Sequence, residues 1–223
     1  MLTRLDDSAK EALAAGARQV AESGLVVGSA GNVSVRAGDR ILITRGGALL
    51  KDVTPEDCVG VAVSEGVMSE TRGSELRPSS ELPLHRAVYA ATDAAAIVHT
   101  HSHYATVLGT LVDELPAVHY TINHFGGPVR VAPYQTFGTE ELAAAVSEAL
   151  RDRSAALMAN HGAVVTGRDL ESAVSGAIEL EWLASIYYHA ILCGTPNILS
   201  EAELDAVRDR ARQIRYGVEA TAR

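Results

Sequence analysis

Short apolar segments joined by tight turns alternate with longer helical stretches along this chain, and this pattern constrains the fold most. Residues 32–36 and 40–44 predict one β-hairpin, and residues 155–159 and 163–166 predict another. Further strands are expected at residues 58–64, 67–70, 95–99 and 129–132, and helices at residues 8–23, 80–91, 102–111, 140–150, 170–186 and 201–216. Because several neighbouring strands are hairpin-connected, we expect a mixed or largely antiparallel sheet covered by helices.

Length and composition restrict the function classes. The 223 residues suit one domain, residues 1–223, with a substantial core. A formal net charge of −9 without a basic stripe argues against nucleic acid as the main partner. No apolar run approaches the ~20 residues that span a membrane, and no signal peptide is expected. The two cysteines, Cys58 and Cys193, are far apart and imply no disulfide framework. We therefore expect a cytoplasmic protein.

His99 and His101 follow an apolar segment that we expect to be a short buried strand. Residues i and i+2 of an extended chain point to the same side, so both imidazoles can reach one ion. His161 lies in the turn of the second hairpin, where it could supply a third ligand. Three histidines with one open position are typical of a catalytic zinc site. Ordinary hydrogen-bonded histidines at a strand end give the same pattern, and spacing alone leaves both interpretations open.

His103 extends the pattern to HTHSH. It joins the same face if the strand continues, and it points elsewhere if a helix begins at Ser102. The remaining histidines are expected to be surface or hydrogen-bonded polar residues: His85, His119, His124 and His189.

The segment Pro78-Ser79-Ser80-Glu81 opens a predicted helix. Serine hydroxyls and a first-turn glutamate are common at helix starts, so a simple N-terminal cap explains the motif. The same hydroxyls and N–H groups can also bind a phosphate. If Glu81 lies beside a metal, it can take and return a proton on carbon. Glycine-rich turns at residues 28–32 and 45–47 are compatible with simple turns and lack the GxGxxG and Walker patterns.

Together these motifs resemble the class II aldolase family. The matching segments are GNVSVR, ILITRGG, PSSE, IVHTHS, HYTI, APYQTFGT, ANHG and RYG, in the family's order between Ser29 and Tyr216. The resemblance implies an α/β fold: a single-domain αβα three-layer sandwich with a mixed, largely antiparallel central sheet. It also implies a homotetramer with active sites at subunit interfaces.

The resemblance implies a zinc ion held by His99, His101 and His161. Glu81 is implied as a further ligand in the empty enzyme and as the acid/base in turnover. Tyr120 matches a tyrosine that a neighbouring subunit contributes to protonate the aldehyde oxygen.

Substrate contacts are implied in the same way. Phe137 and Tyr216 match residues that shape the aldehyde end of the pocket, although core or terminal packing is the alternative. The substrate phosphate is expected to contact Ser29, Gly31, Asn32, Gly46, Gly47, Ser79 and Ser80.

The turn at residues 45–47 departs from the family, which usually has proline at the position of Arg45 and serine or threonine at that of Gly46. Losing the hydroxyl leaves the Gly46 N–H as a donor, and Arg45 could supply positive charge. Alternatively, the substrate carries a different anionic group.

The activity that the resemblance implies is zinc-dependent, reversible aldol cleavage of a short ketose 1-phosphate. L-Fuculose 1-phosphate, for example, would give dihydroxyacetone phosphate and L-lactaldehyde, and 5-deoxypentulose phosphates suit the same chemistry. The two lysines, Lys10 and Lys51, lie in an amphipathic helix and a polar turn, which disfavours a Schiff-base mechanism.

Other reactions on this scaffold remain open, namely those of a sugar-acid phosphate decarboxylase or a thio-sugar phosphate dehydratase. A 4-epimerase is disfavoured, because the related epimerases carry aspartate where Glu81 stands. A non-catalytic module similar to adducin head domains is disfavoured by the presence of all the metal ligands.

Overall fold

The computed structural model describes residues 2–38, 40–63 and 76–214. Its helices are α1 Leu2–Glu22, α2 Leu82–Ala91, α3 His103–Leu108, α4 Glu140–Ala149, α5 Leu170–Cys193 and α6 Glu201–Gln213. Its strands are β1 Asn32–Ala37, β2 Arg40–Thr44, β3 Cys58–Ala62, β4 Ala96–Thr100, β5 Glu114–Leu115, β6 Val129–Ala132, β7 Ala155–Met158 and β8 Gly162–Gly167. Short 3-10 helices are η1 Leu50–Asp52, η2 Pro55–Asp57 and η3 Tyr120–Phe125.

Within these ranges the strands form one sheet in the order β3-β2-β1-β4-β8-β7-β6-β5. The pair β6–β7 is parallel, and the other neighbouring pairs are antiparallel. This confirms the expected mixed, largely antiparallel sheet. Strand β4 lies between β1 and β8, where His99 pairs with Asn32 on one side and with Val164 on the other.

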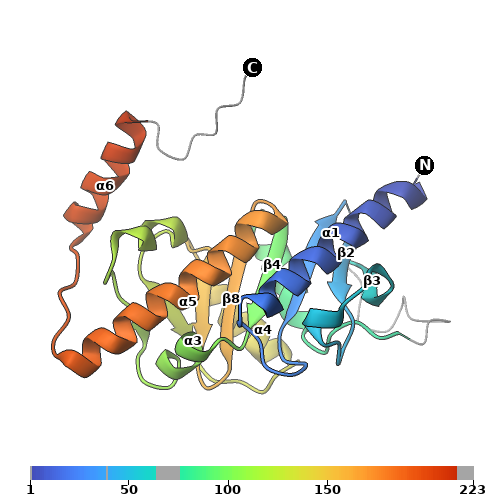
Figure 1. Ribbon diagram of the computed structural model, residues 1–223, viewed down its shortest axis with the longest axis horizontal. Coiled ribbons are helices and arrows are strands. Elements are labelled where there is room, and N and C mark those ends of the chain that lie inside the picture. Colours follow the sequence, from blue (N-terminus) through green and yellow to red (C-terminus); the bar gives the residue numbers. More distant parts are fainter. Residues whose placement is uncertain (1, 39, 64–75, 215–223) are drawn as a thin grey trace.

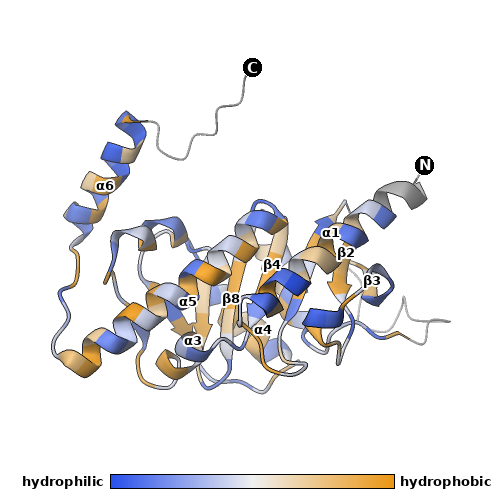
Figure 2. Cartoon of the chain, in the orientation of Figure 1, coloured by the Kyte–Doolittle hydropathy of each residue, from blue (hydrophilic) through white to orange (hydrophobic). Residues whose placement is uncertain are grey.

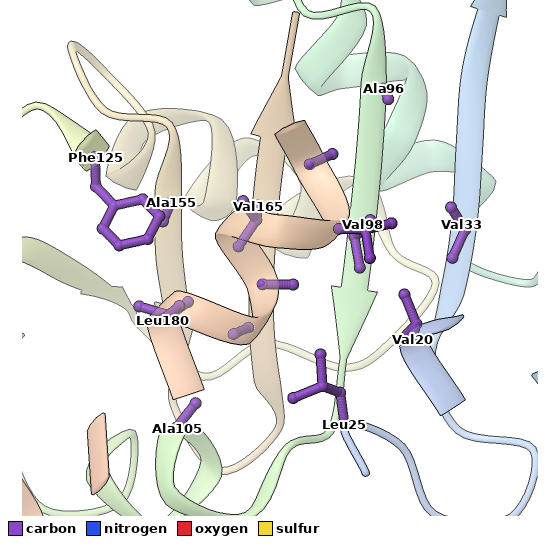
Figure 3. Close-up of a cluster of buried hydrophobic side chains, with 14 of the residues drawn as sticks. Val20, Leu25, Val33, Ala96, Val98, Ala105, Phe125, Ala155, Val165 and Leu180 are labelled. Carbon is purple, nitrogen blue, oxygen red and sulfur yellow. The ribbon is translucent and has the colours of Figure 1, made fainter. Parts of the chain in front are cut away.

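Helices cover both faces of the sheet and complete three layers, as expected for the αβα sandwich (Figure 1). Helices α1, α3 and α5 pack on one face, where Val98 of β4 lies with Val33 of β1 and Val20 of α1 (Figure 3). Helices α2 and α4 pack on the other face, which receives Ile97. Alternate residues of β4 therefore point into different cores. Each large apolar side chain buried in these cores contributes about 1.5–3 kcal/mol to the stability of the fold.

Hydropathy follows this layering. The central strands β4 and β8 are coloured as apolar, whereas α1 shows hydrophilic residues on its outer side (Figure 2). Such one-sided patterning is typical of a helix that covers a sheet. Helix α5 is of mixed colour and leaves Ile178, Trp182 and Leu192 exposed. No helix in the described ranges combines the length and apolar character required to cross a membrane.

Within the described residues the predicted helices and strands are of the correct type, but several of their boundaries are shifted. Helix α2 begins at Leu82 rather than at residue 80, and α3 ends at Leu108 rather than at residue 111. Helix α5 continues to Cys193, where Gly194 ends it. Strand β5 and helix η3 were not predicted. The predicted strand at residues 67–70 lies outside the described residues.

Candidate metal centre and substrate pocket

Four potential metal ligands converge where β4 ends. One ligand atom from each of Glu81, His99, His101 and His161 lies within 4.8 Å of the others. His99 Nε2 is 3.0 Å from His101 Nε2 and 2.9 Å from Glu81 Oε2. His161 Nε2 is 3.3 Å from Glu81 Oε1. Ligands that surround zinc tetrahedrally at 2.0–2.1 Å lie about 3.3 Å apart. The spacing of the four atoms therefore suits one small cation.

Strand geometry brings the histidines together. His99 points to the same sheet face as Ile97, toward α2, and His101 follows two residues later. His161 arrives from the tight turn before β8, in which Asn160 has a positive φ of 54°. A Cβ on Gly162 would lie 2.1 Å from the carbonyl oxygen of Thr100. Glycine at this position is what lets the turn approach β4 closely enough.

The orientation of His99 is fixed by the neighbouring strand. Its Nδ1 lies 2.9 Å from the carbonyl oxygen of Ala163. A carbonyl can accept but not donate, so Nδ1 carries a proton and Nε2 is the nitrogen that faces the other ligands. A backbone acceptor of this kind is common behind metal-binding histidines.

Glu81 occupies the N-cap position of α2 and is 6% exposed. Asn32 Nδ2 donates a hydrogen bond of 2.9 Å to its Oε2. Burial opposes ionisation, but the positive charges of His99 and His161 and the hydrogen bonds from His99 and Asn32 hold the pKa of this carboxyl well below its ordinary value. Glu81 is therefore a carboxylate at neutral pH.

A divalent cation fits the chemistry of these donors. Glu81 Oε1 is buried and accepts no hydrogen bond from the described residues. Burial, followed by the charges of His99 and His161, lowers the pKa of His101 to about 4, so His101 is neutral at pH 7 and offers a lone pair. Despite its burial, His99 has a raised pKa because the Glu81 carboxylate lies beside it. Metal ligands must be deprotonated, so a bound cation takes the place of the proton on His99. A cation between these atoms satisfies Oε1 and the facing nitrogens together.

His103 lies outside this group. Helix α3 starts at His103, and the N–H groups of Tyr104 and Ala105 donate to the carboxylate of Glu181 at 2.8 and 2.9 Å. The helix turns His103 away from the β4 face, and its exposed ring packs on Tyr104 instead.

A pocket of about 310 Å³ opens beside the four ligands, and Glu81, His101 and His161 form part of its wall. His99 lies beneath them and is fully buried. Phe137 is also in the wall. So are the residues expected to contact phosphate: Ser29, Gly31, Asn32, Gly46, Gly47, Ser79 and Ser80.

Two loops of this wall are joined directly. Arg45 forms an isolated β-bridge with Pro78. Gly46 N donates to the carbonyl of Arg77 at 3.0 Å, so the expectation that Gly46 offers a free N–H donor was wrong. The N–H groups of Gly47 and Ser80 have no hydrogen-bond partner among the described residues. Backbone N–H groups of this kind can bind an anion.

Arg45 is the one permanently charged cation among the described residues that line the pocket. Its Nε donates to Asp57 Oδ1 at 2.5 Å, and its Nη1 lies 3.4 Å from the carbonyl of Gly46. A hydrogen bond from the Thr54 backbone, together with that of Arg45, lowers the pKa of Asp57. The guanidinium is partly exposed, and its Nη2 has no partner among the described residues.

Tyr120, the tyrosine expected to protonate the aldehyde oxygen, does not line this pocket. Tyr120 begins η3 and is 48% exposed. Its ring packs on His119, which in turn contacts Trp182. Tyr216 lies outside the described residues.

Comparison with known proteins identifies the family. Residues 11–188 match the family model described as Class II Aldolase and Adducin N-terminal domain. The chain belongs to the class II aldolase and adducin family. Class II aldolases are metal-dependent lyases, and this chain is one of them.

Its relatives include the 5-methylthioribulose-1-phosphate/5-deoxyribulose-1-phosphate aldolase of Rhodospirillum rubrum, 42% identical over 196 residues that cover 87% of this chain and 86% of the relative. The L-fuculose phosphate aldolase of Escherichia coli K12 is 37% identical over 198 residues, covering 87% and 89%. A solved L-fuculose 1-phosphate aldolase superposes with a TM-score of 0.85 at 34% identity, covering 92% of this chain and 96% of that one.

Sequence reasoning missed several residues of this aldolase site. Tyr134, Gln135 and Asn160 line the pocket, and all three lie within the segments that carried the resemblance. His85 is fully buried behind Asn32 and forms a hydrogen bond with it. The available signal was its spacing of four residues from Glu81, which places both side chains on one side of α2.

Proposed function

We propose that this chain catalyses reversible aldol cleavage of a short ketose 1-phosphate to dihydroxyacetone phosphate and an aldehyde, with zinc as its metal. The observation that carries the proposal is that the group of three histidines and the buried Glu81 carboxylate lies at a pocket also lined by serine hydroxyls and by backbone N–H groups without a hydrogen-bond partner among the described residues. The ligand group suits a ketone and its adjacent hydroxyl, and the hydroxyls and N–H groups suit a phosphate.

A bound zinc ion supplies Lewis acidity, which stabilises the negative charge that develops on the oxygens of the substrate. Glu81 moves the proton on carbon. During cleavage the bond between C3 and C4 breaks, the C4 hydroxyl loses its proton, and C3 gains one, so atoms balance without a co-reactant. Oε1 is the oxygen for this transfer, because Oε2 already accepts the hydrogen bond from Asn32 and Oε1 accepts none from the described residues.

Tyr120 exchanges the proton of the aldehyde oxygen in this proposal, and it acts in the pocket of a neighbouring subunit. Its exposure and its absence from the pocket wall of its own chain support this arrangement. The same arrangement requires an oligomer, and we propose a homotetramer. Phe137 and Tyr216 shape the aldehyde end of the site.

The phosphate is held by Ser29, Asn32, Ser79 and the N–H groups of Gly47 and Ser80. Arg45 adds the positive charge, in place of the hydroxyl that the family usually has in this turn. A guanidinium can form two parallel hydrogen bonds to a phosphate, and Nη2 is unpaired among the described residues. With Arg45 in place of that hydroxyl, we expect the pocket to remain specific for a phosphorylated substrate.

Two substrates deserve direct comparison, namely L-fuculose 1-phosphate and 5-deoxyribulose 1-phosphate. The relative that is 42% identical is named for 5-methylthioribulose 1-phosphate and 5-deoxyribulose 1-phosphate, which supports the second. The exposed aromatic rings of Tyr134 and Phe137 at the pocket also suit an apolar tail on the aldehyde part. We therefore expect 5-deoxypentulose or 5-methylthiopentulose 1-phosphates to be cleaved at least as well as L-fuculose 1-phosphate.

The experiment is a cleavage panel of these ketose 1-phosphates with zinc-loaded protein, with and without chelator. Both products are quantified, dihydroxyacetone phosphate by a coupled reductase and the aldehyde by derivatisation. We expect equal amounts of the two products, and loss of both with chelator. Release of carbon dioxide, or loss of water without carbon–carbon cleavage, would replace the aldolase assignment by decarboxylation or dehydration.

A further inference from the structure

A buried histidine that the proposed mechanism does not use lies directly behind the site. His85, on α2, is fully buried. Its Nε2 is 2.5 Å from Asn32 Oδ1, and its Nδ1 is 2.7 Å from Ser34 Oγ. Ser34 Oγ is in turn 2.9 Å from the hydroxyl of Tyr89. These hydrogen bonds connect α2 to strand β1 on the sheet face that also carries Glu81.

The chemistry of the end groups fixes the direction of every hydrogen bond in this network. The Glu81 carboxylate can only accept, so Asn32 must present its Nδ2 to Oε2 and its Oδ1 to His85. His85 Nε2 therefore carries a proton and Nδ1 accepts from the Ser34 hydroxyl. The Ser34 oxygen then accepts from the Tyr89 hydroxyl. The network runs one way, from Tyr89 to Glu81.

The surroundings keep His85 in the one form that this direction requires. Burial, with the positive charge of His99, lowers the pKa of His85 to about 3. His85 is therefore neutral at pH 7 and retains an acceptor at Nδ1. A charged imidazolium would present a second N–H to Ser34 and reverse that hydrogen bond.

We propose that His85 is a positioning residue that locks the Asn32 side-chain amide with its N–H edge toward Glu81 Oε2. The amide would otherwise gain a second orientation, in which Oδ1 faces the carboxylate and two acceptors repel each other in a buried site. Locking the amide keeps Oε2 occupied and leaves Oε1 as the oxygen that exchanges the proton. This inference rests on the proposed function, in which Glu81 carries that proton.

The main test compares His85→Met, which removes both ring nitrogens, with His85→Gln, which restores one donor and one acceptor. We expect His85→Met to lower kcat by about 10- to 100-fold, as loss of residues that orient ligands commonly does, with zinc content unchanged. His85→Gln should recover most of the loss. Full kcat in His85→Met, or equal kcat in the Met and Gln variants, would overturn the proposal.

A double-mutant cycle separates positioning from a merely structural role. If His85 acts through Asn32, His85→Met should not lower kcat further in an Asn32→Ala background. Additive losses would overturn the proposal. The matched control is Val88→Ala, which truncates a fully buried side chain on the same helix. This control should lower the free energy of unfolding while leaving kcat unchanged.

Two further measurements keep the outcome clear. Ser34→Ala removes the hydroxyl that fixes the His85 tautomer, and it should give a smaller loss of kcat that also disappears in Asn32→Ala. This variant decides the question if His85→Met does not fold. Exchange of the C3 proton of dihydroxyacetone phosphate with deuterated water is measured on the unmodified protein. A protein that neither cleaves the ketose phosphates nor catalyses this exchange would refute the proposed function itself, whereas an active protein with unaffected variants refutes only the role of His85.

Discussion

His99 donates its Nδ1 proton to the carbonyl oxygen of Ala163 across 2.9 Å, so the strand next to β4 decides which ring nitrogen faces the metal centre. His99→Gln should therefore lower zinc affinity by at least the roughly 100-fold that loss of such an orienting contact alone can cost. Competition with a chromogenic chelator measures this affinity. The control is His103→Gln, which changes an exposed histidine outside the ligand group and should leave the affinity unaltered. Equal losses in the two variants would show that His99 has no special role.

Glu81→Gln tests the proton transfer at carbon. Glutamine keeps the size and one acceptor oxygen but cannot carry the proton, so kcat for cleavage should fall by about 10²- to 10⁴-fold. Deuterium exchange at C3 of dihydroxyacetone phosphate, followed by NMR, isolates this step from cleavage. Zinc should still bind through the three histidines, which metal analysis verifies. Exchange at the full rate in the variant would assign the proton to another group.

Arg45→Gln tests the positive charge at the phosphate side of the pocket. A charge-assisted hydrogen bond contributes about 1.5–3 kcal/mol, so KM for a ketose 1-phosphate should rise by about 10-fold or more while kcat changes little. The Arg45–Asp57 pair is partly exposed, so the melting temperature should hardly move. Arg168→Gln, an exposed arginine paired with Asp169, is the control. An unchanged KM would mean that the guanidinium stays with Asp57 when substrate binds.

The two cysteines should differ sharply in reactivity. Burial raises the pKa of the Cys58 thiol to about 11, so at pH 8 this thiol is neutral as well as inaccessible. Cys193 is exposed near the end of α5. A thiol reagent should therefore label Cys193 at pH 8 in the folded protein, and both cysteines after denaturation. Peptide mapping of the labelled protein identifies the sites, and labelling of Cys58 in the folded state would contradict its burial.

His85 should make stability sensitive to acid. Its folded-state pKa of about 3 lies below the ordinary value of 6.5, so the unfolded chain binds the proton more tightly. The contribution is complete above pH 6.5 and is lost as the pH falls toward 3. The free energy of unfolding of metal-free protein should therefore fall less steeply below pH 6.5 in His85→Gln than in the unmodified chain. Parallel curves for the two proteins would show that His85 is not held neutral.

Local patterns were sufficient to predict much of this architecture. The apolar segment before His99 indicated a buried strand, and the period of two correctly placed His99 and His101 on one face. The turn at His161 was predicted to supply another ligand, and it brings His161 into the same group. Both predictions depended on neighbouring residues in the chain, which sequence periodicity describes well.

The rest depends on tertiary contacts. His85 was expected to be an ordinary polar residue, because its contact with Asn32 joins residues 53 positions apart. The Gly46 N–H was expected to be free, but it donates a hydrogen bond to the backbone carbonyl of Arg77 in a neighbouring loop. Strand β5 has two residues and no periodicity to detect. These contacts depend on which segments, distant in the sequence, pack against each other, and local sequence patterns do not specify this packing.

Asn32 lies on β1 and His99 on β4, and the two residues are paired in the β1–β4 register. His161 directly precedes β8, the other neighbour of β4. A slip of one residue in that register would turn His99 and His101 to the opposite face, away from Glu81. A chain with misaligned central strands would thus lack the cluster altogether. Metal uptake during refolding consequently reports on strand alignment, and the ion is retained only by chains whose long-range pairing is complete.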